Sequence, residues 1–148
     1  MAAGDPIAWS DIATRVGEDD LIADSSTWDD TPEVAAMSVT ATLVNTRRYR
    51  IWFTGRVSTD VAGDYTGLRI REDAGVAGTQ LVFSGNIYLP TTTGNGFPTF
   101  LYAEYTATAD GAKTFTLTGA RQAGTGTAHR IRASANSPAY LIVERIIT

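Results

Sequence analysis

Side chains that commonly carry out chemistry are scarce in this chain of 148 residues. His129 is the only histidine and cysteine is absent. The sequence therefore offers neither supporting partners for a histidine-based triad nor a histidine or thiolate cluster for zinc. Because His129 lies between Ala128 and Arg130 in an alternating, strand-like stretch, we interpret it as structural.

Two pairs of adjacent aspartates are the next candidates. Asp19-Asp20 and Asp29-Asp30 offer carboxylates for a calcium ion or for the acid pair of a glycoside hydrolase. The spacing of a calcium loop, with acids at alternate positions and a closing glutamate, is absent. We expect solvated loop acids, with no metal, no cofactor and no enzymatic activity.

Glycine-rich and arginine-rich stretches suggest two further ligands, phosphate and nucleic acid. "GTGTAH" and "GNGF" lie between predicted strands, and neither is followed by a helix whose N-terminus would hold a phosphate. Arginines recur at alternate strand positions in a chain of net charge −4. We expect these arginines to form cross-strand pairs with Asp and Glu rather than to contact nucleic acid. They are Arg48, Arg50, Arg56, Arg69, Arg71, Arg130 and Arg132.

Charge divides the chain into an acidic N-terminal arm, residues 1–33, and a basic body, residues 34–148. The arm holds 9 of the 16 acidic residues and only 1 of the 12 basic residues. Such an arm either docks on a basic surface, its own or that of a neighbour, or is a solvated leader. The stretch "PIAWSDIATRV" within it predicts one or two helical turns, and "DDLIADSSTWDDTPE" predicts a loop anchored by Leu21, Ile22 and Trp28.

From Val34 onward, apolar and polar residues alternate with a period of two, in stretches separated by Gly, Asn, Asp and Pro clusters. This pattern predicts an all-β domain over residues 34–148, an eight-stranded jelly-roll β-sandwich with an extended N-terminal arm. The predicted strands cover residues 34–44, 47–57, 65–73, 79–85, 99–107, 113–119, 128–133 and 139–147.

The last predicted strand is apolar on both faces. Its two sets of apolar residues are Tyr140, Ile142 and Ile146 on one face and Leu141, Val143 and Ile147 on the other. Both faces are expected to be covered, one by the domain's own core and the other by a second copy of the chain. No apolar run is long enough to span a membrane, and "MAAGDPIAWSD" lacks the pattern of a secretory signal.

Several aromatic residues are predicted to lie on the outer faces of the strands. Trp52 shares a strand face with arginines, and Tyr102 shares one with Glu104. Aromatic side chains beside Arg are typical of interface cores, although they also cap the ends of sandwiches. Further aromatics flank the long connection "YLPTTTGNGFPTF", namely Tyr88, Phe97 and Phe100.

Three stretches resemble a family of bacteriophage virion proteins, particularly of actinobacterial phages. These stretches are "NTRRYRIWFTGRVSTDVAGDYTGLRIRED", "YTATADGAKTFTLTGARQAGTGTA" and "SPAYLIVERI", so the resemblance covers roughly Val34 to Ile147. Its members serve as capsid decoration, head-fibre or minor tail proteins. The resemblance implies a trimeric jelly roll of the tumour-necrosis-factor and C1q shape, with the last strand near the threefold axis. Members often carry Asp where this chain has Glu144, which retains the charge.

Together these observations predict a non-enzymatic virion protein, a homotrimer on the capsid exterior that is assembled in the host cytoplasm and stabilises the major capsid protein shell. No nucleic acid or membrane partner is expected. The predicted capsid anchors are Ile7, Trp9, Ile12 and Trp28. The predicted trimer interface consists of Trp52, Tyr102, Tyr140, Ile142 and Ile146.

Two alternatives remain at this point. The first is a minor tail or fibre-tip module that binds a host-surface glycan, with Trp52, Tyr88 and Tyr102 stacking on sugar rings. The second is a trimeric cell-surface or secreted domain of the C1q type, which the missing signal pattern disfavours.

Overall fold

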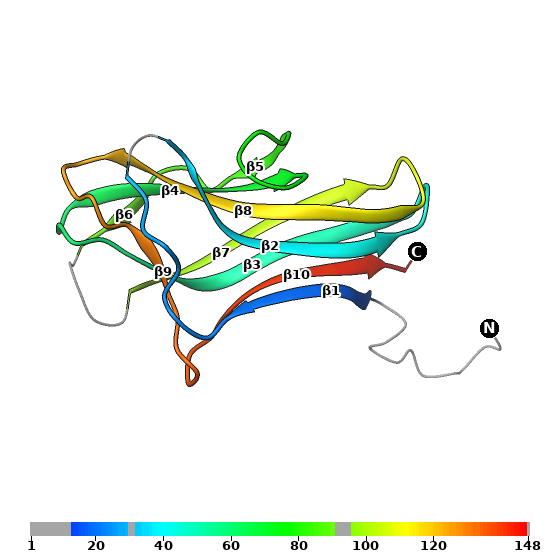
Figure 1. The fold of residues 1–148 in the computed structure, drawn as a ribbon, viewed down its shortest axis with the longest axis horizontal. Coiled ribbons are helices and arrows are strands. Elements are labelled where there is room, and N and C mark those ends of the chain that lie inside the picture. The colour runs from blue at the N-terminus through cyan, green and yellow to red at the C-terminus, as the bar shows by residue number, and fades with distance from the viewer. Residues whose placement is uncertain (1–12, 30–31, 91–95, 148) are drawn as a thin grey trace, which may run out of the picture.

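The computed structural model describes residues 13–29, 32–90 and 96–147 (Figure 1). Within these ranges the chain is all-β, with ten strands in two antiparallel five-stranded sheets and no helix. The strands are β1 (Ala13–Leu21), β2 (Val34–Leu43), β3 (Arg48–Ser58), β4 (Asp64–Glu72), β5 (Gln80–Phe83), β6 (Ile87–Leu89), β7 (Phe97–Thr106), β8 (Gly111–Ala123), β9 (Arg130–Arg132) and β10 (Ala139–Ile146).

The strand order confirms the predicted jelly roll. One sheet runs β1-β10-β3-β7, with β9 also paired to β3, and the other runs β2-β8-β4-β5, with β6 also paired to β4. When the short strands β6 and β9 are set aside, the eight remaining strands are divided between the two sheets in jelly-roll order. The first, eighth, third and sixth form one sheet, and the second, seventh, fourth and fifth form the other.

Alternate residues of the long strands fill the space between the two sheets. In β2, for example, Met37, Val39, Ala41 and Leu43 are buried while the residues between them are exposed. Full burial of one such aliphatic or aromatic side chain contributes about 1.5–3 kcal/mol relative to exposure. The largest fully buried side chains are Trp28, Tyr49, Phe53, Phe115, Ile51, Leu68, Ile70, Leu89, Leu117, Ile131, Leu141 and His129.

All eight predicted strands are present, but β1 and β6 were not anticipated. The helical turns expected in "PIAWSDIATRV" are wrong for the described part of that stretch, because Ala13–Val16 begin β1. β1 pairs antiparallel with β10, from Ala13 opposite Ile146 to Leu21 opposite Ala139. The edge of β10 supplies backbone partners that outweigh the local helical preference of a short, polar segment. Figure 1 shows the two strands side by side.

The segment between β1 and β2 crosses the end of the sandwich and is held there by Trp28. This side chain is 2% exposed and donates from Nε1 to Thr66 Oγ1 over 3.0 Å. The Trp28 backbone forms a β-bridge with His129. The prediction that Trp28 anchors the protein to a capsid is therefore wrong, because its ring is enclosed within its own core.

Acidic residues of the same segment bind arginines of the strands beneath it. The nearest pairs are Asp24 with Arg132 at 2.8 Å, Asp29 with Arg121 at 3.1 Å and Glu33 with Arg71 at 2.8 Å. Of the two interpretations of the acidic arm, docking on a basic surface is correct for the segment that carries Asp24, Asp29 and Glu33. The basic surface belongs to the same chain. The predicted cross-strand pairing of arginines is confirmed for Arg48 with Glu104 and for Arg50 with Glu144, the latter at 3.3 Å. The other four paired arginines of that set contact Glu33 or Asp24 of this segment, and no carboxylate of the described residues pairs with Arg56.

A candidate binding face on the outer side of strands β10, β3 and β7

One continuous aromatic surface lies on the outer side of the sheet β1-β10-β3-β7. Antiparallel register aligns its residues in rows, with Ile142 of β10 opposite Trp52 of β3 and Trp52 opposite Tyr102 of β7. The next row places Tyr140 opposite Thr54 and Thr54 opposite Phe100. We call this surface the aromatic face, defined as Trp52, Phe100, Tyr102, Tyr140 and Ile142.

The alternation of β3 explains why Trp52 faces outward. Ile51 and Phe53 are fully buried in the core, so the residue between them is turned to the opposite side of the sheet. The same spacing in β7 buries Leu101 and Ala103 and exposes Phe100 and Tyr102. Hydrophobic burial on one side of the sheet therefore fixes the positions of the aromatic rings on the other side.

Trp52 forms the ridge of the aromatic face. Its ring centroid is 6.1 Å from that of Phe100, with an interplanar angle of 35°. An open depression of about 400 Å³ lies on each side of Trp52. One depression is lined by Arg15, Glu18, Trp52, Thr54, Tyr140 and Ile142, and the other by Arg50, Trp52, Phe100, Tyr102 and Glu144. Phe100 is 63% exposed and Tyr102 is 38% exposed, so both rings are accessible.

Paired charges form a polar rim along one end of the aromatic face. Glu104 accepts hydrogen bonds from the Tyr102 hydroxyl and from Arg48. The hydrogen bond from Tyr102, followed by that from Arg48, lowers the pKa of Glu104, and the same bond to Glu104 raises the pKa of Tyr102. At neutral pH the rim therefore carries an ionised Glu104 beside a neutral tyrosine hydroxyl that is already oriented.

Four of the five predicted interface residues come together on this face, and one of them is already covered. Ile142 is 2% exposed in the single chain, because it lies between Trp52 on β3 and Glu18 on β1. The expectation that Ile142 needs a second copy for burial is therefore wrong. Ile146 lies farther along β10 and lines a different depression, with Arg47 and Arg145.

The remaining predicted site residues lie elsewhere. Ile7, Trp9 and Ile12 fall outside the described residues. Tyr88 is on β6 in the opposite sheet, where its ring centroid is 5.2 Å from that of Tyr65. The three aromatics of the glycan hypothesis are therefore not brought together. Phe100 was noted as a surface aromatic but not as a site residue, although its spacing of two from Tyr102 places it on the same face.

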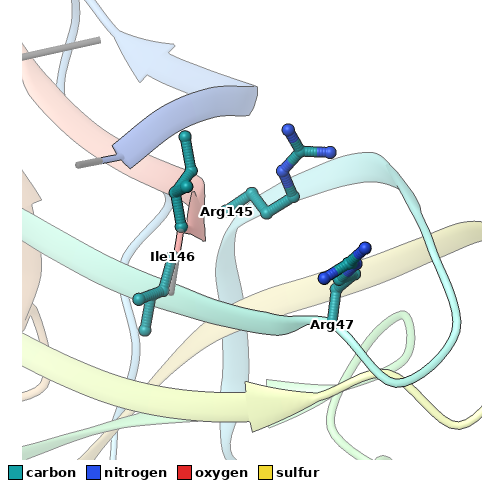
Figure 2. A pocket seen from close by; sticks show the side chains of 4 residues that line it. Arg47, Arg145 and Ile146 are labelled. Carbon is teal, nitrogen blue, oxygen red and sulfur yellow. The ribbon is translucent and has the colours of Figure 1, made fainter. Parts of the chain in front are cut away.

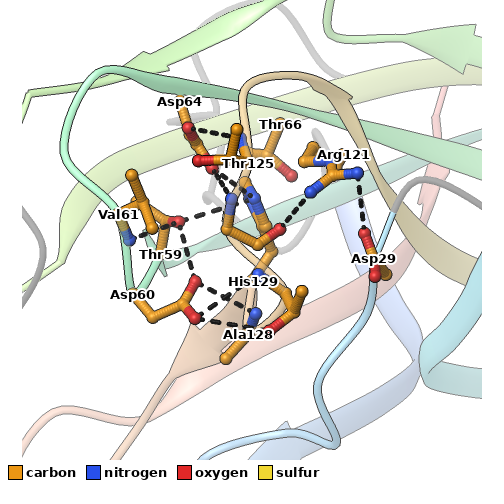
Figure 3. Close-up of polar contacts among 12 residues, drawn as sticks. Asp29, Thr59, Asp60, Val61, Asp64, Thr66, Arg121, Thr125, Ala128 and His129 are labelled. Atoms are coloured by element: carbon orange, nitrogen blue, oxygen red, sulfur yellow. Dashed lines mark hydrogen bonds and ion pairs between the residues drawn. The ribbon is translucent and has the colours of Figure 1, made fainter.

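A second polar cluster joins the loops that follow β3 and β8 (Figure 3). His129 is fully buried, as expected of a structural histidine, and its Nε2 is 3.3 Å from Asp64 Oδ2. Asp64 also accepts backbone N–H bonds from Gly126 at 2.7 Å and Thr125 at 3.1 Å. Asp60 accepts from the Ala128 N–H at 3.1 Å.

The side chains of Asp60, Asp64 and His129 hold the two loops together. Burial lowers the pKa of His129 by more than the Asp64 carboxylate raises it. Burial also raises the pKa of Asp64, but the N–H bonds from Gly126 and Thr125 outweigh that effect and the net pKa is lowered. At neutral pH, a neutral histidine therefore faces an ionised aspartate whose oxygens are already held by backbone amides.

Two of the four paired aspartates, Asp19 and Asp29, have structural partners. Asp19 accepts the backbone N–H of Ser38 at 3.1 Å, and Asp29 pairs with Arg121. Among residues 13–29, 32–90 and 96–147, no three acidic or histidine side chains are placed to hold a metal ion. The same ranges contain no helix that is long and apolar enough to cross a membrane.

No protein-family model and no curated protein matches the chain, but solved structures do. The sugar-binding C-terminal domain of EclA is 16% identical, with a TM-score of 0.39 over 97% of this chain and 86% of that chain. The VP2 subviral particle protein of infectious bursal disease virus is 12% identical, with a TM-score of 0.42 over 92% and 38%. A family 35 carbohydrate-binding module from Clostridium thermocellum is 11% identical, with a TM-score of 0.40 over 88% and 96%.

These similarities carry no argument about the function of this chain. All three TM-scores are below 0.5, and this chain spans little more than a third of the VP2 chain. None of the three is a bacteriophage protein, so the resemblance to phage virion proteins remains an expectation. The jelly-roll assignment depends on the strand order of the chain itself.

Proposed function

We propose that the protein is a non-enzymatic bacteriophage virion protein, a homotrimer that decorates the capsid exterior and stabilises the major capsid shell. The observation that carries this proposal is the aromatic face. It presents Trp52, Phe100 and Tyr102 on a rigid sheet beside a rim of paired charges. Aromatic anchors surrounded by polar groups are the usual composition of a protein interface.

The simplest partner for the aromatic face is another copy of the same chain. Cyclic symmetry lets the same surface of each copy meet its neighbours in a closed assembly. The rings of Phe100 and Tyr102 would lose their exposed area, while Arg48 and Arg50 would keep their carboxylate partners at the edge. Most of the binding free energy would then come from the aromatic rings, because exposed ion pairs contribute only about 0–1 kcal/mol each.

Size-exclusion chromatography with light scattering tests the interface. We expect a trimer for the native chain and a monomer for the Trp52→Ala and Phe100→Ala variants. Tyr88→Ala is the matched control, because it removes an exposed aromatic ring from the other sheet. A native chain that remains monomeric at high concentration would contradict the proposal.

Attachment to the capsid is assigned to residues 1–12, which contain the three remaining anchors, Ile7, Trp9 and Ile12. The test is deletion of residues 1–12, with β1 and Trp28 kept because both belong to the sandwich. The shortened chain should form trimers normally but should no longer coat purified capsids. Full coating by the shortened chain would show that the anchors are elsewhere.

Glycan binding is a second candidate, favoured by the two depressions on either side of Trp52. Each depression combines an aromatic wall with charged groups that can bond hydroxyls, as in Arg50 and Glu144. A glycan array on which binding is lost in Trp52→Ala and kept in Tyr88→Ala would support it. Because both candidates use one face, a bound sugar should also compete with trimer formation. Sugar binding without such competition would indicate that only one of the two functions uses this face.

A further inference from the structure

A separate basic depression lies at the end of the sandwich where β10 ends (Figure 2). Its volume is about 170 Å³, and its lining consists of Arg47, Arg145, Ile146 and Ile147. In Figure 2 the side chains of Arg47 and Arg145 lie near each other, and Ile146 lies to the left of both at the end of β10. The depression thus combines two cationic groups with an apolar wall.

The backbone that carries Arg47 is held firmly in place. In the turn between β2 and β3, the Arg47 N–H donates to the Val44 carbonyl at 3.2 Å, and the Arg47 carbonyl accepts from the Ala107 N–H at 3.0 Å. Thr46 donates to the Ala107 carbonyl at 2.8 Å and adopts φ 63°, a left-handed conformation that is unusual for a β-branched residue. The turn is therefore fixed by its neighbours rather than free to rearrange.

The backbone at Arg145 is also held in place. Arg145 lies opposite Tyr49 in the register of β10 with β3 and opposite Thr14 in the register of β10 with β1. The β10 backbone at this position is thus flanked by a strand on each side. Both arginines consequently project from ordered backbone, which reduces the conformational entropy that a bound ligand would have to remove.

The lack of a carboxylate partner distinguishes Arg47 and Arg145 from most other arginines of the described chain. Within residues 13–29, 32–90 and 96–147, neither Arg47 nor Arg145 has a carboxylate within ion-pair distance, and the same is true of Arg56. The arginines with carboxylate partners are Arg15, Arg48, Arg50, Arg69, Arg71, Arg121, Arg130 and Arg132. Two like charges that share one depression without a described counter-charge make a site of positive potential.

We propose that Arg47 and Arg145 form an oxyanion-binding site, for a phosphate or carboxylate group. Guanidinium groups bind such oxyanions through paired, charge-assisted N–H bonds, and their positive charge persists at all physiological pH values. Ile146 and Ile147 would pack against the apolar portion of a ligand that bears the oxyanion. The site is distinct from the aromatic face and does not depend on the proposed function.

Titration with inorganic phosphate and with acetate, followed by ¹H–¹⁵N NMR that includes the arginine Nε–H signals, tests the site. We expect saturable shifts at Arg47, Arg145 and Ile147 in low salt. A stronger response to phosphate would indicate a phosphate-bearing ligand, and a stronger response to acetate would indicate a carboxylate. Because arginine does not titrate, phosphate affinity should rise from about pH 5.5 to about pH 7.5 as the ligand gains its second charge.

Single substitutions locate the site within the chain. Arg47→Gln and Arg145→Gln should each weaken phosphate binding about tenfold or more, since each removes charge-assisted bonds. Arg56→Gln is the matched control, because Arg56 also lacks a described carboxylate partner but does not line the depression. The proposal is overturned if neither probe produces saturable shifts at the depression. It is also overturned if Arg56→Gln weakens binding as much as the other two substitutions.

Discussion

The indole ring of Trp28 lies directly on Gly119, where a Cβ atom would be 2.5 Å from the indole Cε2. Real side chains do not tolerate that separation, so the glycine provides the space in which the ring is buried. Trp28 belongs to the segment that crosses between the sheets, and Gly119 lies within β8. This contact ties the crossing segment to the second sheet and places its tryptophan in the core.

Substitution of Gly119 by alanine should therefore destabilise the fold through Trp28. We expect Gly119→Ala to lower the free energy of unfolding by about 1–3 kcal/mol, the usual cost of overpacking a core. Urea unfolding followed by circular dichroism measures it. In a Trp28→Ala background, most of that cost should vanish, because the colliding ring is gone. An equal cost in both backgrounds would show that the two residues are not coupled.

Thr46 carries backbone strain that a substitution can relieve. At φ 63° the β-branched threonine is unfavourable, whereas asparagine tolerates this region. Thr46→Asn should raise the free energy of unfolding by about 0.5–1 kcal/mol. Thr79→Asn, at an exposed loop threonine outside the left-handed region, should have little effect. Thermal unfolding of both variants measures the difference, and no gain in Thr46→Asn would mean that side-chain contacts offset the strain.

Glu33 should make stability depend on pH. Burial raises the pKa of Glu33, but hydrogen bonds from Arg71 and Thr118 outweigh it and lower the pKa below its ordinary value of 4.5. A depressed folded-state pKa gives stabilisation that is present above the unfolded value and is lost as pH falls through the folded value. The free energy of unfolding should therefore decline below about pH 4.5 through this group.

The matching variants for this prediction are Glu33→Gln and Glu18→Gln. Chemical denaturation at a series of pH values should show a weaker acid-side decline in Glu33→Gln than in the native chain. Glu18→Gln removes a more exposed pair with Arg15 and should leave the decline unchanged. An identical pH profile for the native chain and Glu33→Gln would contradict the assignment.

Gly17 of β1 packs closely against β2. A Cβ at this position would lie 3.0 Å from both Val39 Cγ2 and Ala41 Cβ. Gly17→Val should push β1 away and cost about 1–3 kcal/mol, because its branched side chain meets a packed surface. Amide hydrogen exchange should then accelerate in β1 and in the β10 amides that pair with it. Thr14→Val, on an exposed position of the same strand, is the control.

The sequence was most informative where one side of a strand is buried. In β3, the alternation of Tyr49, Ile51 and Phe53 with arginines and Trp52 predicts both the core side and the outer side, and the structure has both. The aromatic face could be anticipated for the same reason, since the core residues leave Trp52 and Tyr102 only one direction in which to point.

Features that depend on distant partners were not predictable in this way. The sequence of β1 is charged and contains glycine, so no local pattern predicts a strand there. The segment forms a strand because it pairs with the edge of β10, more than a hundred residues later in the chain. In the sequence, Trp28 stands beside two aspartates and is therefore interpreted as a surface anchor. Its contacts are with Gly119, Thr66 and His129, which come from three other parts of the chain. No local pattern encodes the meeting of such segments.

The pairing of β1 with β10 has a consequence for biosynthesis. Ala13 and Ile146 are partners in the sheet although more than a hundred residues separate them, so Ile146 must leave the ribosome before that pairing closes. Bringing such distant segments together carries a large loop-closure entropy and slows folding. Since Tyr140 and Ile142 come from this same strand, a nascent chain lacks the complete aromatic face until β10 has left the ribosome.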